Sequence, residues 1–177
     1  MQAIASGRRV LDLFSYTGGF SVAAASGGAA GVTAVDSSAA ALELAAESLA
    51  ETASAVPARF EKSDAFRFLR SQSEHYDLIV VDPPPLARTR GDVKRAARAY
   101  KDLILHALRR ATPGARLLVF ACSHHMGPEL FRKIVFGASL DAERPVRVLR
   151  ALAPPVDHPV SIDHPEGAYL NGLLLEA

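Results

Sequence analysis

Short apolar segments rich in branched residues alternate along the chain with stretches of helical periodicity. This alternation constrains the fold more than any other feature, because strands separated by helices pair in parallel through crossover connections. We therefore predict a doubly wound α/β fold, with a mostly parallel sheet covered by helices on both faces. The predicted strands are residues 10–14, 31–36, 58–62, 77–82, 116–121, 146–152 and 169–176.

Helical periodicity is clearest after the fourth predicted strand, where apolar residues recur at i, i+3, i+4 and i+7 spacing and form one stripe. They are Val93, Ala96, Ala97, Tyr100, Leu103, Ile104, Ala107 and Leu108. Pro113 and Gly114 are expected to end this element. Other helices are predicted over residues 20–26, 65–70 and 128–140, and from an N-cap at Ser37 or Ser38 through Thr52.

Length and composition narrow the class of protein. A chain of 177 residues suits one domain with one sizeable core. The net charge of +1 favours no class of partner, so any contact with nucleic acid has to be local. A single cysteine excludes an intramolecular disulfide, and no apolar segment is long enough for a membrane span or a secretory signal. We expect one domain over residues 1–177, in the cytoplasm.

Three acidic residues lie at or near the ends of the first three predicted strands. Asp12 lies within the first strand, Asp36 ends the second, and Asp64 follows the third. In such sheets the ligand binds beyond the carboxyl ends of the strands. An acidic residue after the second strand suits the two hydroxyl groups of a ribose, in NAD and in S-adenosylmethionine alike. The alternative is an ordinary N-cap or loop aspartate.

The turn after the first strand distinguishes between these two cofactors. A dinucleotide site needs G-x-G-x-x-G so that the backbone can approach a pyrophosphate, whereas residues 14–20 contain only the pair Gly18 and Gly19. The carboxylate of Asp12 would oppose a pyrophosphate but would suit the ammonium group of a methionine moiety. The sequence therefore favours S-adenosylmethionine as the cofactor.

A second motif, Asp82 followed by Pro83, Pro84 and Pro85, closes the fourth predicted strand. Rigid prolines fix the backbone where a planar substrate base would meet the methyl donor. Asp82 can accept a hydrogen bond from an exocyclic amine or a ring N–H, or hold a base in register. The alternative is a proline run that only ends the strand.

Cys122 follows the fifth predicted strand, in a segment that also contains His124 and His125. A thiolate that adds to C6 of a pyrimidine makes C5 nucleophilic enough to take a methyl group from a sulfonium. A base then removes the C5 proton and the thiolate leaves. Either histidine is a candidate for lowering the pKa of the thiol. The alternative is that Cys122 is a buried small hydrophobic residue.

The polar face of the clearest helix, with the segment before it, is basic. From Arg88 to Arg110 only Asp92 and Asp102 are acidic. The basic residues are Arg88, Arg90, Lys94, Arg95, Arg98, Lys101, Arg109 and Arg110. This local excess of positive charge suits the phosphate backbone of an RNA substrate, and the alternative is a solvated amphipathic face.

Histidine and acidic residues also gather near the C-terminus. They are Asp157, His158, Asp163, His164 and Glu166. Their spacing matches no standard zinc pattern, and the neighbouring prolines favour a rigid loop that closes over the site. No metal is predicted.

These features together resemble the bacterial 23S rRNA 5-methylcytosine methyltransferases and their close relatives. The resemblance rests on residues 10–20, 81–84, 121–126 and 157–170, and it covers nearly the whole chain. The first two segments are shared by many methyltransferases, whereas the last two are much more specific. The resemblance implies a Rossmann-like, class I methyltransferase sheet of seven strands whose last strand is antiparallel.

The resemblance also implies residue roles. Asp12 and the turn through Gly19 would hold the methionine part of S-adenosylmethionine, Asp36 the ribose and Asp64 the adenine. Asp82 would line the base pocket, and Cys122 would be the nucleophile, with no second cysteine to assist release. The full cofactor-binding set is Asp12, Ser15, Thr17, Gly18, Gly19, Asp36, Ser37, Asp64, Ala65 and Asp82.

The sequence departs from this family at three points. Family members usually carry an N-terminal RNA-binding PUA domain and a β-rich region, and we expect both to be absent because the sequence begins shortly before its first strand. Pro85 stands where a different residue is usual, and Asn171 stands where relatives tend to have lysine.

The leading expectation is an S-adenosylmethionine-dependent methyltransferase that modifies C5 of cytosine in 23S rRNA through an adduct between Cys122 and C6. A guanine-N methyltransferase of the same fold needs no thiol, so Cys122→Ala separates the two. A non-catalytic module that binds RNA or protein is a third possibility, which cofactor binding distinguishes. A nucleotide-dependent dehydrogenase is disfavoured by the missing G-x-G-x-x-G.

Overall fold

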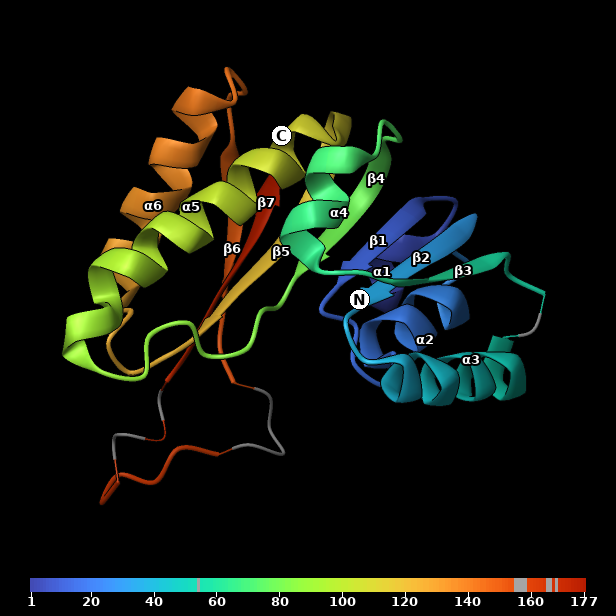
Figure 1. Ribbon diagram of the computed structural model, residues 1–177, viewed down its shortest axis with the longest axis horizontal. Coiled ribbons are helices and arrows are strands. Elements are labelled where there is room, and N and C mark those ends of the chain that lie inside the picture. Colours follow the sequence, from blue (N-terminus) through green and yellow to red (C-terminus); the bar gives the residue numbers. More distant parts are fainter. Residues whose placement is uncertain (54, 155–158, 165–166, 168) are drawn as a thin grey trace.

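The computed structural model describes residues 1–53, 55–154, 159–164, 167 and 169–177, which form one seven-stranded sheet with helices on both faces (Figure 1). The strands are β1 Arg9–Leu13, β2 Gly31–Asp36, β3 Ala58–Lys62, β4 Tyr76–Val81, β5 Ala111–Cys122, β6 Arg147–Leu152 and β7 Leu170–Glu176. The helices are α1 Gln2–Ala5, α2 Gly19–Ser26, α3 Ala39–Ala53, α4 Ala65–Ser71, α5 Val93–Arg109 and α6 Pro128–Asp141, with the 3-10 turn η1 Arg90–Asp92. No helix in these residues is long and apolar enough to span a membrane.

The strand order is β3-β2-β1-β4-β5-β7-β6, so the direction of winding reverses between β1 and β4. The strands from β3 to β5 pair in parallel, whereas β7 pairs antiparallel with both β5 and β6. The predicted α/β sheet, including its antiparallel last strand, is therefore confirmed. The carboxyl ends of β1, β2, β4 and β5 meet at one end of the sheet, which is where ligands bind in such folds.

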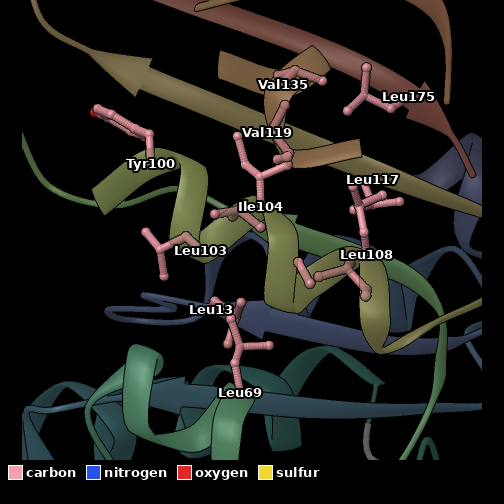
Figure 2. Packing of buried hydrophobic residues seen from close by; sticks show 14 of the residues in the cluster. Leu13, Leu69, Tyr100, Leu103, Ile104, Leu108, Leu117, Val119, Val135 and Leu175 are labelled. Carbon is pink, nitrogen blue, oxygen red and sulfur yellow. The ribbon is translucent and has the colours of Figure 1, made fainter. Parts of the chain in front are cut away.

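Two apolar cores lie on opposite faces of the sheet. The larger lies between the sheet and helices α4, α5 and α6, and Figure 2 shows Leu103, Ile104 and Leu108 of α5 over Leu117 and Val119 of β5. The smaller joins α1, α2 and α3 to the other face. Successive strand residues point to opposite faces, so strands covered on both sides are apolar almost throughout.

The predicted apolar stripe of α5 and one of the two predicted N-caps of α3 are found in the structure. The apolar stripe of α5 is buried against the sheet, and the helix follows a capping box formed by Thr89 and Asp92 in the 3-10 turn. For α3, Ser38 rather than Ser37 is the cap, because its Oγ accepts a hydrogen bond from the backbone N–H of Ala41 at 3.2 Å.

Pro113 and Gly114 do not end the helix, which is a correction to the sequence-based prediction. The helix α5 ends at Arg109, and both residues lie inside β5. They belong to an irregularity between β4 and β5, where Asp77 alone lies opposite residues 112–115. Proline has no N–H to donate to the sheet, and glycine at a φ of +75° provides the bend, so both fit such an irregularity.

Candidate active site

The turn after β1 contains positive φ angles, which residues other than glycine rarely adopt. The φ angle is +60° at Phe14, +48° at Tyr16 and +83° at Gly18, so Phe14 belongs to this turn and not to the strand as predicted. The backbone N–H of Ser15 donates to the Val35 carbonyl at 3.1 Å, and that of Gly18 to the Ser15 carbonyl at 2.8 Å. Strained backbone held by its surroundings is typical of binding turns.

The two glycines of this turn differ in what surrounds them. A Cβ on Gly18 would lie 2.8 Å from the Cβ of Ala45 on α3, so a larger residue does not fit there. A Cβ on Gly19 would meet no atom within 4 Å. The fold itself therefore requires Gly18, whereas Gly19 borders open space at the start of α2.

Asp12 is a buried carboxylate with one unused oxygen. The hydroxyl of Ser21 donates to Oδ2 at 2.7 Å, while Oδ1 has no hydrogen-bond partner in the described residues. Burial, with smaller contributions from the charges of Asp82 and Asp36, raises the pKa of Asp12 to about 7. An ammonium group donating to Oδ1 would satisfy this oxygen and favour the ionised carboxylate. The site therefore fits the ammonium group of S-adenosylmethionine.

Asp36 joins the turn after β1 to the start of α3. Its Oδ2 accepts the backbone N–H of Tyr16 at 2.9 Å, and its Oδ1 accepts that of Ser38 at 2.9 Å. Each carboxylate oxygen can accept a further hydrogen bond. The side chain of Ser37 is exposed beside it. The roles predicted for Asp36 in holding the ribose and for Ser37 in binding the cofactor agree with this geometry and stay predictions.

Asp64, which follows β3, has a structural role in addition to its predicted role in cofactor binding. It is the N-cap of α4, and its Oδ1 accepts the backbone N–H of Arg67 at 2.9 Å. The side chain of Ala65 is buried in the core. Asp64 and Ser37 line an open cavity of about 690 Å³, which has room for an adenine ring, and the adenine role of Asp64 stays a prediction.

Asp82 and Cys122 face each other across two adjacent parallel strands. Asp82 directly follows β4, and Cys122 is the last residue of β5, not the first residue after it as predicted. The thiol donates to Oδ1 of Asp82 at a Sγ–Oδ1 distance of 4.0 Å. Burial raises the pKa of Asp82, and burial followed by the Asp82 charge raises that of Cys122 to about 11.

The expected effect of a histidine on this thiol is therefore wrong. A neighbouring imidazolium would lower the pKa of Cys122, whereas burial and then the charge of Asp82 raise that pKa. The ring of His124 packs against Tyr169 with a centroid distance of 5.4 Å. The thiol is thus protonated at neutral pH until a base accepts its proton.

Two residues that sequence reasoning missed fix the loops around this pair. The hydroxyl of Ser123 donates to the Ala87 carbonyl at 2.7 Å, which ties the segment after the prolines to the loop after β5. The side-chain amide of Asn171 donates to the Met126 carbonyl at 2.7 Å. Asn171 therefore supports the loop that carries the histidines. Ser123 lies within the segment 121–126, and Asn171 is a departure from the family, but no local pattern predicts their hydrogen-bond partners, which are 36 and 45 positions away in the sequence.

Two cavities meet at Cys122. The Asp82 cavity has a volume of about 500 Å³, and its walls include Phe20, Asp82, Cys122 and Tyr169. The His124 cavity has a volume of about 440 Å³, and its walls include Arg88, Cys122, His124 and Tyr169. Cys122 and Tyr169 line both cavities, so a planar group in either one lies beside the thiol.

Tyr100 has a buried hydroxyl group near this site. The residue was predicted as part of the apolar stripe of α5, and its ring is indeed buried and packs edge-on against Phe131 at 5.8 Å. Burial first, and then the charges of Cys122 and Asp82, raise the pKa of its phenol to about 12. Tyr100 therefore stays neutral and adds no charge beneath the thiol.

The basic stretch divides into paired and unpaired residues. Arg95 pairs with Asp92, and Lys101 with Asp141, each at 2.8 Å, while Arg110 donates to the Leu69 carbonyl at 3.2 Å. These residues already have partners within the chain, and contact of the stretch with RNA stays a prediction. In the described part of the chain no ion pair involves Arg88, Arg90, Lys94 or Arg98, which are all exposed.

The histidine and acidic cluster near the C-terminus lies partly outside the described residues, which exclude Asp157, His158 and Glu166. Among the residues that the structure describes, no group of three or more histidine, cysteine or acidic side chains converges as metal ligands do. The described part of this segment includes Asp163, which is exposed. The predicted closure of this loop over the site stays untested.

Comparison with known sequences identifies relatives. The model of the S-adenosylmethionine-dependent methyltransferase family matches residues 1–159. Ribosomal RNA large subunit methyltransferase I of Tolumonas auensis is 45% identical over 177 residues, which cover 98% of this chain and 45% of that protein. Its namesake in Erwinia tasmaniensis is 41% identical over 172 residues, covering 95% and 43%. The chain thus spans less than half the length of these curated relatives.

Solved structures agree with the sequence comparison. A protein from Streptococcus mutans assigned as a SAM-dependent methyltransferase superimposes with a TM-score of 0.82 at 25% identity, covering 99% of this chain and 46% of that one. SMU.776, assigned as a methyltransferase and crystallised with SAH, gives a TM-score of 0.81 at 27% identity, covering 98% and 46%. The family match over residues 1–159 shows that the chain belongs to the S-adenosylmethionine-dependent methyltransferases.

Proposed function

We propose that this chain methylates C5 of a cytosine in large-subunit ribosomal RNA, with Cys122 as the nucleophile. The observation that carries the proposal is the contact between Cys122 Sγ and Asp82 Oδ1, at 4.0 Å, at the same end of the sheet as the buried Asp12. The names of the relatives, ribosomal RNA large subunit methyltransferase I, support an RNA substrate. The unpaired cations Arg88, Arg90 and Lys94 add a surface for phosphate groups.

Asp82 is suited to accept the thiol proton. Because the pKa of Cys122 is about 11, the thiol needs a base at neutral pH, and Oδ1 of Asp82 already accepts its hydrogen bond. As the proton passes to Oδ1, the sulfur electron pair forms a bond to C6 of the cytosine. The electrons of the C5–C6 double bond move onto C5, where they are conjugated with the C4–N3 bond, and this makes C5 nucleophilic.

S-adenosylmethionine supplies a methyl group carried on a positively charged sulfur. With the donor bound, the electron-rich C5 would form a bond to that methyl carbon as the carbon–sulfur bond of the donor breaks. A water molecule then takes the C5 proton, the C5–C6 double bond re-forms, and the bond between C6 and Sγ breaks. The thiolate of Cys122 regains its proton from Asp82, so the protein returns to its starting state.

A guanine-N methyltransferase needs neither the thiol nor this adduct, and the product distinguishes the two reactions. We would incubate the chain with unmodified large-subunit rRNA and S-adenosylmethionine labelled in the methyl group, and digest the RNA to nucleosides. The label is expected in 5-methylcytidine with the native chain and in no nucleoside with Cys122→Ala. Label in a methylguanosine that persists in Cys122→Ala would overturn the proposal.

A further inference from the structure

The His124 cavity lies beside Cys122 but has no part in the reaction described above. It is separated from the Asp82 cavity by Cys122 and Tyr169, which line both. The ring of His124 lies against that of Tyr169 at a centroid distance of 5.4 Å and an angle of 51°. The exposed Arg88 also lines the cavity.

We propose that the His124 cavity binds the nucleotide adjacent to the target cytosine, with its base stacked on the His124–Tyr169 pair and its phosphate near Arg88. This inference rests on the proposed function, because it takes the ligand to be single-stranded RNA. It adds a subsite that selects unpaired RNA, since a base inside a duplex cannot stack on protein side chains. The target cytosine itself occupies the Asp82 cavity.

The chemistry of the walls favours a nucleotide as the ligand. Proteins bind unpaired bases by stacking them on tyrosine and histidine rings, and bind the attached phosphates with arginine. Both groups occur together in this cavity, and its volume of about 440 Å³ admits a nucleobase. In the described residues the guanidinium of Arg88 forms no ion pair, whereas that of Arg95 on the same basic stretch pairs with Asp92 at 2.8 Å. Arg88 is therefore available to a phosphate.

The position of the His124 cavity indicates that it binds the neighbour of the target cytosine and not the target itself. Asp82 and Phe20, which follows the cofactor turn at Gly19, line the Asp82 cavity and not the His124 cavity. A base that must touch both the thiol and the methyl donor therefore belongs in the Asp82 cavity. The common wall formed by Cys122 and Tyr169 leaves the next nucleotide of the strand in the His124 cavity.

The walls of the cavity are held in place before any ligand binds. The backbone N–H of Ser123 donates to the Tyr169 carbonyl at 3.2 Å, and the Ser123 hydroxyl donates to the Ala87 carbonyl at 2.7 Å. These bonds join the three segments that carry Arg88, His124 and Tyr169. A preformed stacking site loses less conformational entropy on binding than a mobile one.

The test measures stacking directly, with the full chain and short single-stranded RNA probes. Each probe carries one cytidine with 2-aminopurine as its neighbour, on the 5′ side in one probe and the 3′ side in the other. Stacking on an aromatic side chain quenches 2-aminopurine fluorescence, so the native chain is expected to quench one probe. Tyr169→Leu is expected to remove this quenching and to weaken binding by about 5- to 150-fold, whereas Tyr169→Phe retains both.

Matched variants separate stacking from charge. His124→Ala is expected to reduce the quenching, whereas His75→Ala, an exposed histidine before β4, does not. Arg88→Ala is expected to weaken binding of every probe and to lower the salt-dependence slope by about one. Arg147→Ala, at the far end of the sheet where Arg147 pairs with Glu176, is expected to change neither.

Failure of this inference differs from failure of the proposed function. No quenching of either probe by the native chain at saturating RNA, or equal quenching by Tyr169→Leu, overturns the subsite. If those same samples still convert rRNA cytidine to 5-methylcytidine, the proposed function stands and only the subsite is wrong. If the native chain quenches a probe but yields no 5-methylcytidine, the methylation is wrong and the RNA-stacking site stands.

Discussion

The carboxylates on the two sides of the switch point between β1 and β4 have different hydrogen-bond partners. On the β1–β2 side, backbone N–H groups donate to both oxygens of Asp36, and one buried oxygen of Asp12 receives no hydrogen bond from the described residues. On the β4–β5 side, Asp82 faces a thiol, and the pKa values of both groups are raised. The first arrangement offers carboxylate oxygens that can hold a ligand, and the second places a proton between two groups that can exchange it. Binding and chemistry should therefore be separable by mutation.

The largest expected effect is the loss of methyl transfer with cofactor binding retained. Cys122→Ala should lower methyl transfer to RNA by at least about a thousandfold, because the chain contains no other thiol. The affinity for S-adenosylmethionine, measured by titration calorimetry, should not change. Asp36→Ala should do the opposite and weaken cofactor binding. Loss of cofactor affinity in Cys122→Ala would show that the two sides are not independent.

Asp82→Asn should lower the rate of methyl transfer by about 10²- to 10⁴-fold, because the amide cannot accept the thiol proton. In the native chain, the single-turnover rate should rise with pH as Asp82 loses its proton, and burial places that rise above the usual range of aspartate. The variant should lack this rise. Asp141→Asn, on the exposed end of α6, is a control that should keep the native profile.

Asp12→Asn should weaken cofactor binding by about 10- to 100-fold, because the amide forms no charge-assisted bond to an ammonium group. It should also change the pH dependence of stability. The pKa of Asp12 is raised from 3.8 to about 7 in the folded chain, so the folded state holds a proton that the unfolded state releases. This contribution is present below pH 3.8 and is lost as the pH rises to about 7.

Urea unfolding at a series of pH values checks this contribution. Between pH 4 and 7 the free energy of unfolding of the native chain should fall relative to that of Asp12→Asn, by up to about 1.4 kcal/mol per pH unit. Parallel curves for the two proteins would mean that the pKa of Asp12 is ordinary in the folded state.

The smallest expected effects compare the two glycines of the cofactor turn. Gly18→Ala should destabilise the chain by about 1–3 kcal/mol, because its φ is positive and the new Cβ would meet Ala45. Gly19→Ala should leave thermal stability nearly unchanged and weaken S-adenosylmethionine binding, since its Cβ would enter the open space next to α2. Equal thermal stability of the two variants would contradict the difference in their surroundings.

The sheet and the acidic positions of the site follow from sequence patterns. Apolar strands end where polar residues begin, so the pattern located Asp36, Asp82 and Cys122 at strand ends. Parallel pairing then brings such ends together. The turn at Gly18 was also recognisable, because adjacent glycines after a first strand permit the backbone conformation that the structure has.

Other features depend on contacts between distant segments, which no local pattern encodes. The irregularity at Pro113 involves β4 and the last residue, because Gly114 N–H donates to the Ala177 carbonyl at 2.6 Å. The partner of the Cys122 thiol is Asp82, which is 40 positions away in the sequence, whereas His124 is only two positions away but packs against Tyr169. Proximity along the chain therefore suggested the wrong partner.

The most direct test of the account is to trap the bond between Cys122 and a cytosine. A large-subunit rRNA fragment containing 5-fluorocytidine, incubated with the chain and S-adenosylmethionine, should form a covalent complex, because fluorine at C5 cannot leave as a proton does. Mass spectrometry of the digested complex should locate the nucleotide on Cys122, and Cys122→Ser should form none. Methylated RNA with no covalent complex, or a complex at another residue, would contradict the assignment of Cys122 as the nucleophile.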